Sequence, residues 1–208
     1  MEISEQDSDI DRLQYERAIW NSGINHITGI DEVGRGPLAG PVYACAVVFQ
    51  REYFLPEVRD SKELSEKKRE YLKEILCDHA LSWSLGSADV NEIDQLNIRQ
   101  ATFIAMRRAI SRLKIFPGYI LFDGENLPDS PYDSRGIIKG DKLSFTIGAA
   151  SIIAKVSRDD YMKKIDREFP QYNLKKNKGY GTAEHIRAIK QYGPCKYHRM
   201  SFLKKIID

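Results

Sequence analysis

Apolar positions follow two different spacings along the chain. Short, nearly continuous apolar runs are typical of strands that are covered on both faces, and a spacing of three to four residues is typical of helices. The first pattern predicts strands at ITGID (27–31), PVYACAVVF (41–49), WSLGSA (83–88), YILFD (119–123) and near 135–138. The second predicts helices over 9–21, 66–79, 91–115, about 146–168 and 182–191, followed by an irregular end.

Alternating strands and helices imply an α/β sheet with helices packed over it. Ser65 is expected to be the N-cap of the helix over 66–79. Leu96, Phe103, Met106, Ile110 and Leu113 are expected to face the core from a single helix. Trp20, Trp83 and Cys45 are also expected to be packing residues, and His185 and His198 show no metal-ligand spacing.

The bulk composition suits one domain with a real core, because the chain has 208 residues of which 42% are hydrophobic. The acidic first dozen residues predict no secretory leader, and no apolar run approaches the roughly 20 residues that span a bilayer. Cys45, Cys77 and Cys195 form no CxxC pair, which favours a reducing compartment over a disulfide framework. We therefore expect a cytoplasmic protein without membrane association, and a monomer.

Charge is unevenly distributed although the net charge is only +2. Residues 139–208 contain 16 Lys and Arg against 7 Asp and Glu, a balance of +9, which leaves −7 for residues 1–138. This asymmetry favours an anion-facing C-terminal half beside an acidic half. A solvated helical surface would explain the same pattern.

Two of the predicted strands, ITGID and YILFD, end in aspartate. Asp31 is followed by Glu32, and Asp141 lies in a KGD tripeptide before the long predicted helix. Asp31, Glu32, Asp123 and Asp141 can therefore meet at one edge of the sheet, where all-oxygen ligands favour Mg²⁺ or Mn²⁺. The alternative is that each aspartate caps a turn or helix independently.

A glycine-rich turn with one arginine directly follows the acidic pair, in Val33-Gly34-Arg35-Gly36-Pro37. Glycines leave backbone amides open to a phosphate or ribose, and Arg35 can contact a phosphate oxygen. A tight strand-to-strand turn is the simpler explanation of GRG alone, but its place beside the carboxylates favours substrate binding. Neither a GxxxxGK[ST] loop nor GxGxxG occurs, so nucleotide hydrolysis and dinucleotide binding lack support.

Six motifs in order resemble the ribonuclease HII family: ITGIDEVGRGPLAGPV (27–42), DSKELSEKKR (60–69), FDGE (122–125), KGD (139–141), AASIIAKVSRDDYM (149–162) and NKGYGTAEHI (177–186). The resemblance spans about residues 10–202. It implies a single ribonuclease H-like catalytic domain, a mixed sheet flanked by helices, with about 170–208 as a basic C-terminal helical extension.

The resemblance also implies residue roles. Asp31, Glu32, Asp123 and Asp141 would hold two Mg²⁺ or Mn²⁺ ions during catalysis. Gly34, Arg35 and Gly36 would read the 2′-hydroxyl and phosphate at the cleaved ribonucleotide, and Tyr180 would pack on the sugar of the following deoxynucleotide. Ser61, Lys62, Lys155 and Arg158 are further candidates for substrate contact, although Asp159 or Asp160 can instead pair with Lys155 or Arg158.

Three positions depart from the family pattern: Asn177 replaces a common His, Glu125 a common Asn, and Gly148 a common Ser or Ala. None is a proposed metal ligand, so the departures concern the grip on the substrate.

The implied reaction is cleavage of the RNA strand of RNA–DNA hybrids, and of duplex DNA 5′ to embedded ribonucleotides, leaving 3′-hydroxyl and 5′-phosphate ends. Two alternatives are a junction resolvase on the same fold, which a deoxy-only substrate would reveal, and a module that binds hybrids without cutting them.

Overall fold

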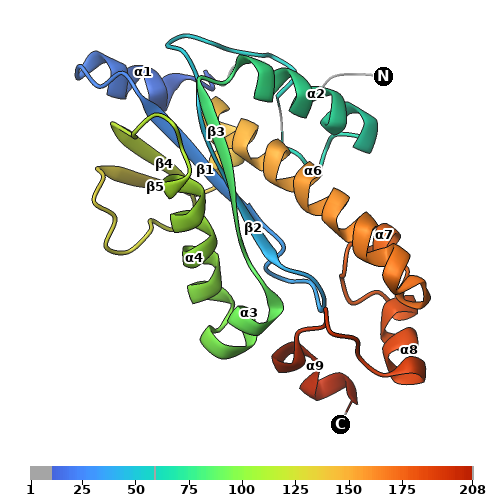
Figure 1. Cartoon of the computed structure of the whole chain (residues 1–208). Coiled ribbons are helices and arrows are strands. Elements are labelled where there is room, and N and C mark those ends of the chain that lie inside the picture. Colours follow the sequence, from blue (N-terminus) through green and yellow to red (C-terminus); the bar gives the residue numbers. More distant parts are fainter. Residues whose placement is uncertain (1–10, 59, 208) are drawn as a thin grey trace.

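A mixed sheet forms the centre of the fold in the computed structural model, which describes residues 11–58 and 60–207. In this part of the chain the strands are β1 (Ile27–Val33), β2 (Val42–Val48), β3 (Ser82–Ala88), β4 (Tyr119–Asp123) and β5 (Ser134–Ile137). Their spatial order is β3-β2-β1-β4-β5 (Figure 1). β2 is antiparallel to both β1 and β3, whereas β4 is parallel to β1 and β5. The predicted strands and the α/β class are confirmed.

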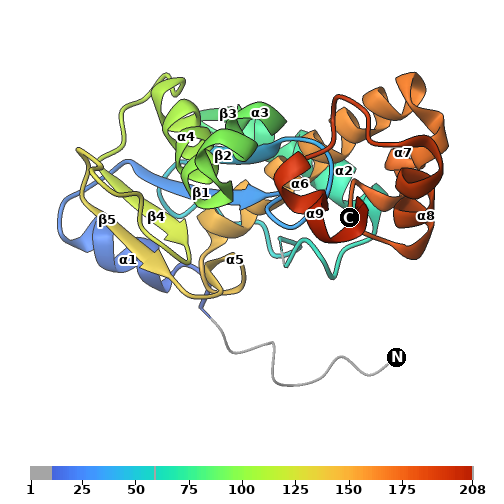
Figure 2. The same cartoon turned by 90° about the horizontal axis from the view of Figure 1, so that it is seen from below.

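Helices cover both faces of this sheet (Figures 1 and 2). They are α1 (Gln14–Asn21), α2 (Glu66–His79), α3 (Val90–Leu96), α4 (Ile98–Ser111), α5 (Gly140–Leu143), α6 (Phe145–Glu168), η2 (Pro170–Tyr172, a 3-10 turn), α7 (Leu174–Asn177), α8 (Ala183–Tyr192) and α9 (Met200–Ile207). α6 packs on β1 and β2 with α2 against it, and α4 packs on β2 and β3. Among the described helices, none is both long and apolar enough to cross a membrane.

The continuous apolar run of β2 is explained by its place between two cores. Cys45 and Val47 belong to the core under α6, and Ala44 and Ala46 to the core under α4. Glycines let the helices approach this closely. A Cβ on Gly29 would overlap the backbone of Thr146 in α6, and one on Gly86 would overlap Ala105 in α4.

Several local predictions are confirmed, since the Ser65 hydroxyl accepts the Lys68 amide and caps α2, and Trp20 and Cys45 are buried. Trp83 is not a core residue as predicted, because it points outward from the edge strand β3 and is 38% exposed. The helix predicted over 9–21 begins only at Gln14, because residues 11–13 are not helical, and residues 9 and 10 lie outside the described range.

The single helix predicted over 91–115 is wrong. Asn97 has φ 71°, which ends α3, and its side chain then accepts the Gln100 amide and caps α4. Asn tolerates this left-handed backbone better than most residues. The interruption turns Leu96 away from the core, so that it is 42% exposed instead of buried, whereas Phe103 and Met106 are buried as predicted.

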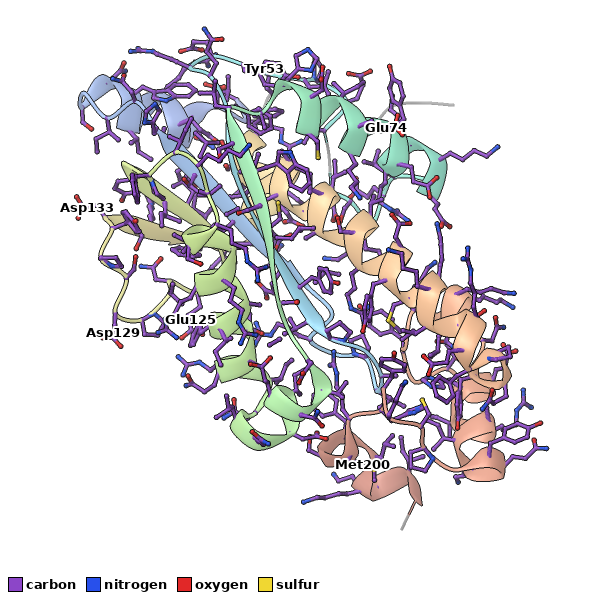
Figure 3. All side chains as sticks on the ribbon, viewed as in Figure 1. Tyr53, Glu74, Glu125, Asp129, Asp133 and Met200 are labelled. Atoms are coloured by element: carbon purple, nitrogen blue, oxygen red, sulfur yellow. The ribbon has the colours of Figure 1, made fainter. Side chains whose placement is uncertain are left out.

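The predicted irregular end is also wrong, because Met200–Ile207 forms α9. Its first amides, those of Met200 and Ser201, are accepted by the Asp94 carboxylate of α3 at 2.8 and 3.0 Å. Figure 3 shows Met200 at the start of this helix. Leu203 is buried in a third core with residues of α6 and α8. The capping residue therefore lies more than 100 positions away, where local sequence patterns do not reach.

Glu16 fixes the beginning of α6. It is fully buried, and its Oε1 accepts hydrogen bonds from the Ser144 hydroxyl (2.6 Å), the Thr146 amide (3.0 Å) and the Thr146 hydroxyl (2.6 Å). A carboxylate at a helix N-terminus is also favoured by the helix dipole. Because Asp141 lies one turn earlier in α5, Glu16 anchors the scaffold beneath a candidate site residue.

Glu16→Ala should lower the free energy of unfolding by about 3 kcal/mol, because it leaves three buried donors without an acceptor. Urea denaturation followed by circular dichroism measures this difference. Glu74→Ala, at an exposed glutamate of α2 (Figure 3), serves as the control and should change stability by less than about 0.5 kcal/mol. Equal losses in both variants would contradict the anchoring role.

Candidate active site

The register of two parallel strands makes Asp31 and Asp123 neighbours. Ile30 of β1 lies opposite Phe122 of β4, and the next residue on each strand is the aspartate. Matching positions on adjacent strands lie about 5 Å apart and point to the same face. β1 continues to Val33 in its pairing with β2, so Asp31 lies inside the strand and not at its end as predicted.

Glu32 and Asp141 complete the acidic group from different elements. Glu32 follows Asp31 on β1 and lines a pocket with Arg35, Arg99 and Asp123. Asp141 is buried in the single turn α5. That turn is tied to β4, because the Gly140 amide donates to Asp123 Oδ1 at 2.7 Å.

The carboxylates interact unfavourably with one another. Burial raises the pKa of Asp31 well above its usual range, and the charges of Glu32 and Asp123 raise it further. Burial likewise raises the pKa of Glu32, which Arg35 partly offsets through an ion pair of 3.2 Å. Burial and the nearby Asp141 raise the pKa of Asp123. The four predicted carboxylates thus form one electrostatically linked group.

This group fits a divalent cation in its charge and its donor atoms. Carboxylate oxygens are the ligands that Mg²⁺ and Mn²⁺ prefer, and a cation would relieve the repulsion that raises these pKa values. Apart from the Glu32–Arg35 pair, the described residues give the four carboxylates no ion pair. Within the described ranges, no three His, Cys, Asp or Glu side chains are placed so that together they could hold a metal ion.

The glycine–arginine loop and Tyr180 lie beside each other. A Cβ on Gly36 would meet the Tyr180 ring at 3.8 Å, and the ring is 44% exposed. Gly34 has φ +94°, and a Cβ there would overlap the Arg158 side chain. Both predicted substrate-reading elements therefore share one surface, and Gly34 is required for both its conformation and its packing.

Ser61 and Lys62 reach the site in different ways. Ser61 is buried, with its Oγ 3.1 Å from the Ser151 hydroxyl, and a hydrogen bond from Ser151 in turn lowers the pKa of Asp31. Lys62 is exposed, and its charge lowers the pKa of Asp123, which opposes the effect of burial. Lys62 therefore remains a candidate for substrate contact, whereas Ser61 supports the carboxylate cluster.

The structure does not present Lys155 and Arg158 to a phosphate as expected. Lys155 is half-buried in an ion pair of 2.8 Å with Asp159, one of the two alternative partners considered. Arg158 is fully buried and donates to the carbonyls of Pro41 (2.9 Å), Lys178 (3.0 Å) and Ala39 (3.2 Å). Arg158 therefore joins the loops that carry GRG and Tyr180.

The three departures from the family pattern have local explanations. Asn177 holds the Tyr180 loop, since its Oδ1 accepts the Gly179 amide (2.8 Å) and its Nδ2 donates to the Tyr172 carbonyl (2.7 Å). Glu125 forms a two-pronged ion pair with Arg99 at the pocket edge. Gly148 leaves room for Arg12, which donates to the Asp141 carbonyl at 2.6 Å.

Sequence reasoning missed supporting residues whose partners are distant in sequence. Ser151 lies in the AASIIAKVSRDDYM motif, on a helix whose other buried positions are mostly apolar. A polar residue at such a position could have indicated a supporting role in the site. Arg199 had no such signal, because it lies in the C-terminal segment that was predicted to be irregular. It is fully buried and donates to carbonyls of residues 34, 35 and 40.

A mixed sheet with carboxylates on its central strands and helices on both faces defines the ribonuclease H-like class. In agreement, the crystal structure of ribonuclease H2 from Pyrococcus horikoshii OT3 superposes with a TM-score of 0.72 and 26% sequence identity. The alignment covers 88% of this chain and 97% of that chain.

Sequence comparison identifies the family within this class. The family model for ribonuclease HII matches residues 28–205. Ribonuclease HII of Caldicellulosiruptor bescii is 48% identical over 208 residues and the full length of both chains. That of Caldanaerobacter subterraneus subsp. tengcongensis is 49% identical over 193 residues, which is 93% of this chain and 80% of the relative. The chain belongs to the ribonuclease HII family, whose members are metal-dependent endoribonucleases that hydrolyse phosphodiester bonds.

Asp31→Asn should stabilise the metal-free protein at high pH. A folded-state pKa above the unfolded value of about 3.9 favours the protonated form, so the Asp31 contribution to stability is present at low pH and lost as pH rises through the folded pKa. Because one pH unit of pKa difference equals about 1.4 kcal/mol, we expect the variant to exceed wild type by about 1 kcal/mol or more at pH 8.

Urea denaturation in EDTA at pH 5 and pH 8 measures this effect. The amide oxygen of Asn can still accept the Glu32 amide, as Asp31 Oδ1 does at 2.7 Å, so the local fold should persist. A variant that is no more stable than wild type at pH 8 would contradict the repulsion inferred for the cluster.

Proposed function

We propose that this ribonuclease cuts the RNA strand of RNA–DNA hybrids and cuts duplex DNA on the 5′ side of an embedded ribonucleotide, leaving 3′-hydroxyl and 5′-phosphate ends. The observation that carries the proposal is the shared surface of the exposed Gly36, the exposed Tyr180 ring and the neighbouring acidic group. It offers separate partners for the ribonucleotide, for the next sugar and for the phosphate between them.

The carboxylates would act as the ion-holding part of the site. The four are linked through their charges, because Asp123 interacts with Asp31, Glu32 and Asp141, and Asp31 also interacts with Glu32. Two Mg²⁺ or Mn²⁺ ions held there would supply an activated water and stabilise the leaving oxygen. Burial of Asp31 and Asp141 fixes their side chains before substrate arrives, which lowers the cost of ordering the site.

Recognition of RNA would depend on the 2′-hydroxyl, which distinguishes ribose from deoxyribose at one position. Gly34, Arg35 and Gly36 supply backbone groups beside the acidic cluster, and the exposed Arg35 and Gly36 are the ones that a sugar–phosphate can reach. The Tyr180 ring next to Gly36 would pack on the following sugar, where an added hydroxyl would obstruct it. This arrangement favours a ribonucleotide followed by a deoxynucleotide.

We also infer a single catalytic domain that acts as a cytoplasmic monomer. The third core joins the C-terminal helices to α6 and to the loop around Leu38, which supports their inclusion in the same domain. Cys45, Cys77 and Cys195 are all free thiols, as a reducing compartment favours.

A duplex DNA with one ribonucleotide tests the reaction. We expect cutting only 5′ to that ribonucleotide, with Mg²⁺ or Mn²⁺ and not with EDTA, and a rate at least about 100-fold lower in Asp31→Asn. Product ends are mapped on denaturing gels.

The matched control is Asp129→Asn, at an exposed aspartate of the loop between β4 and β5 (Figure 3), which should cut at the wild-type rate. Equal cutting of an all-DNA duplex would overturn ribose specificity. Binding of hybrids without cutting in either metal would favour the non-catalytic alternative.

Tyr180→Ala tests the recognition of the following sugar. We expect the preference for a ribonucleotide followed by deoxyribose, over one followed by ribose, to fall about tenfold, which corresponds to about 1.4 kcal/mol of lost ring packing. Competition between the two duplexes in one reaction measures the preference. Tyr192→Ala, at an exposed tyrosine at the end of α8, should leave this preference unchanged, and a similar fall there would count against the role assigned to Tyr180.

A further inference from the structure

Two adjacent residues of the C-terminal segment, His198 and Arg199, are linked to the two elements proposed to contact substrate, which are the GRG loop and Tyr180. The segment pairs with the loop after GRG through an antiparallel bridge between Ala39 and His198. The Arg199 amide donates to the Leu38 carbonyl, and the Gly40 amide donates to the Tyr197 carbonyl, at 2.9 and 2.8 Å. Both side chains are buried, so neither can touch substrate.

Arg199 binds carbonyl groups of the loop over residues 34–40, which contains GRG and is called the reading loop below. Its Nη2 donates to the Gly34 carbonyl (2.6 Å), its Nη1 to the Arg35 carbonyl (2.9 Å), and its Nε and Nη2 to the Gly40 carbonyl (2.9 and 2.7 Å). In a trans peptide the N–H points opposite to the C=O. The amides of Arg35 and Gly36, which share peptide units with the first two carbonyls, are therefore directed away from Arg199.

Those two amides have no acceptor within the described part of the chain, and both residues are exposed. A guanidinium bound to the carbonyl ends also makes the N–H ends better donors, because hydrogen bonds in a chain polarise one another. Arg199 thus holds two outward donors at the place where a ribose hydroxyl or phosphate would lie.

Arg199 is a cation without a carboxylate partner among the described residues, and Arg158 beside it is another. Burial lowers the pKa of Arg199 to about 9, and the Arg158 charge contributes to this. Replacing two such charges by neutral groups would remove their desolvation cost. Because both arginines lie under a loop that we propose binds an anion, a bound phosphate would interact favourably with both charges and offset this desolvation cost.

His198 reaches Tyr180 through His185. Nδ1 of His198 accepts the Cys195 amide at 2.9 Å, so its proton lies on Nε2, which donates to His185 Nε2 at 3.1 Å. The remaining His185 proton is then on Nδ1, which donates to the Tyr180 carbonyl at 2.9 Å. Burial lowers the pKa of His198 to about 4 and also lowers the pKa of His185. Both rings are therefore neutral, as this series of hydrogen bonds requires.

We propose that His198 and Arg199 are positioning residues that hold the reading loop and Tyr180 in one fixed relation, so that a ribonucleotide and the sugar after it are read together. The inference rests on the proposed function and adds the residues that set its specificity.

The test compares Arg199→Lys, Arg199→Met, His198→Gln and His198→Leu with wild type, after circular dichroism has shown that each is folded at the assay temperature. KM and kcat are measured on the single-ribonucleotide duplex, together with the preference for deoxyribose after the ribonucleotide. The matched control is Arg108→Lys, because Arg108 also holds a carbonyl, that of Ser87 at 2.7 Å, and a carboxylate, but on α4.

Arg199→Lys and Arg199→Met, which lose the guanidinium hydrogen bonds to the loop carbonyls, should raise KM at least about tenfold while kcat changes less, because these contacts exist before the chemical step. Arg108→Lys should lower stability without moving KM. His198→Leu should lower the sugar preference about as far as Tyr180→Ala, and His198→Gln, which can still donate to His185, should retain most of it.

Wild-type KM and wild-type preference in folded Arg199→Lys and His198→Leu would overturn the inference. If Arg199→Lys does not fold, the two His198 variants provide the test. Equal sugar preferences in His198→Leu and His198→Gln would also overturn the inference. A wild-type chain that cuts the single-ribonucleotide duplex no better than all-DNA would instead refute the proposed function, and the inference with it.

Discussion

In the middle of the sheet, the parallel pairing of β1 with β4 places Ile30 opposite Phe122, and an aspartate follows each of them. Every other part of the site is arranged around this pair of like charges. Burial raises the pKa values of both aspartates, the charge of Asp123 raises that of Asp31 further, and the charge of Asp141 raises that of Asp123, so the folded chain holds these groups together at a cost that the rest of the fold must offset. A shift of β4 by one residue would point Asp123 to the opposite face and end the pairing.

α6 supplies much of the compensating structure. Glu16 anchors its first turn, Ser151 supports Asp31 from the next turns, and Arg158 joins two loops near its middle. One helix therefore relates the clustered carboxylates to the surface formed by the GRG loop and Tyr180. Gly29 permits the close approach of this helix to β1, which connects a small residue in the sheet directly to the geometry of the site.

The opposite charges of the two halves of the chain serve different ends in the folded molecule. The acidic half provides three of the four clustered carboxylates, and the basic half provides Asp141 together with basic residues in two different settings. Lys163, Lys175 and Lys196 pair with acidic neighbours at the surface, and such exposed pairs contribute little to stability. Arg158 and Arg199 are buried under the reading loop, where their charge acts on the loop through backbone carbonyls. The excess of positive charge seen in the sequence therefore does not all lie at the surface of the protein.

The sequence by itself determined the strands, most helices and the acidic cluster, because apolar periodicity and motif order are local signals. Ser65 as a cap and Cys45 as a core residue follow from the same local rules. The tertiary structure decided what depends on distant partners. Asp94 caps α9 from α3, Asn97 divides one apolar pattern into two helices, and the edge position of β3 exposes Trp83. Arg158 and Arg199 are charged residues that composition alone assigns to the surface, and only the fold shows the carbonyl groups that make their burial possible.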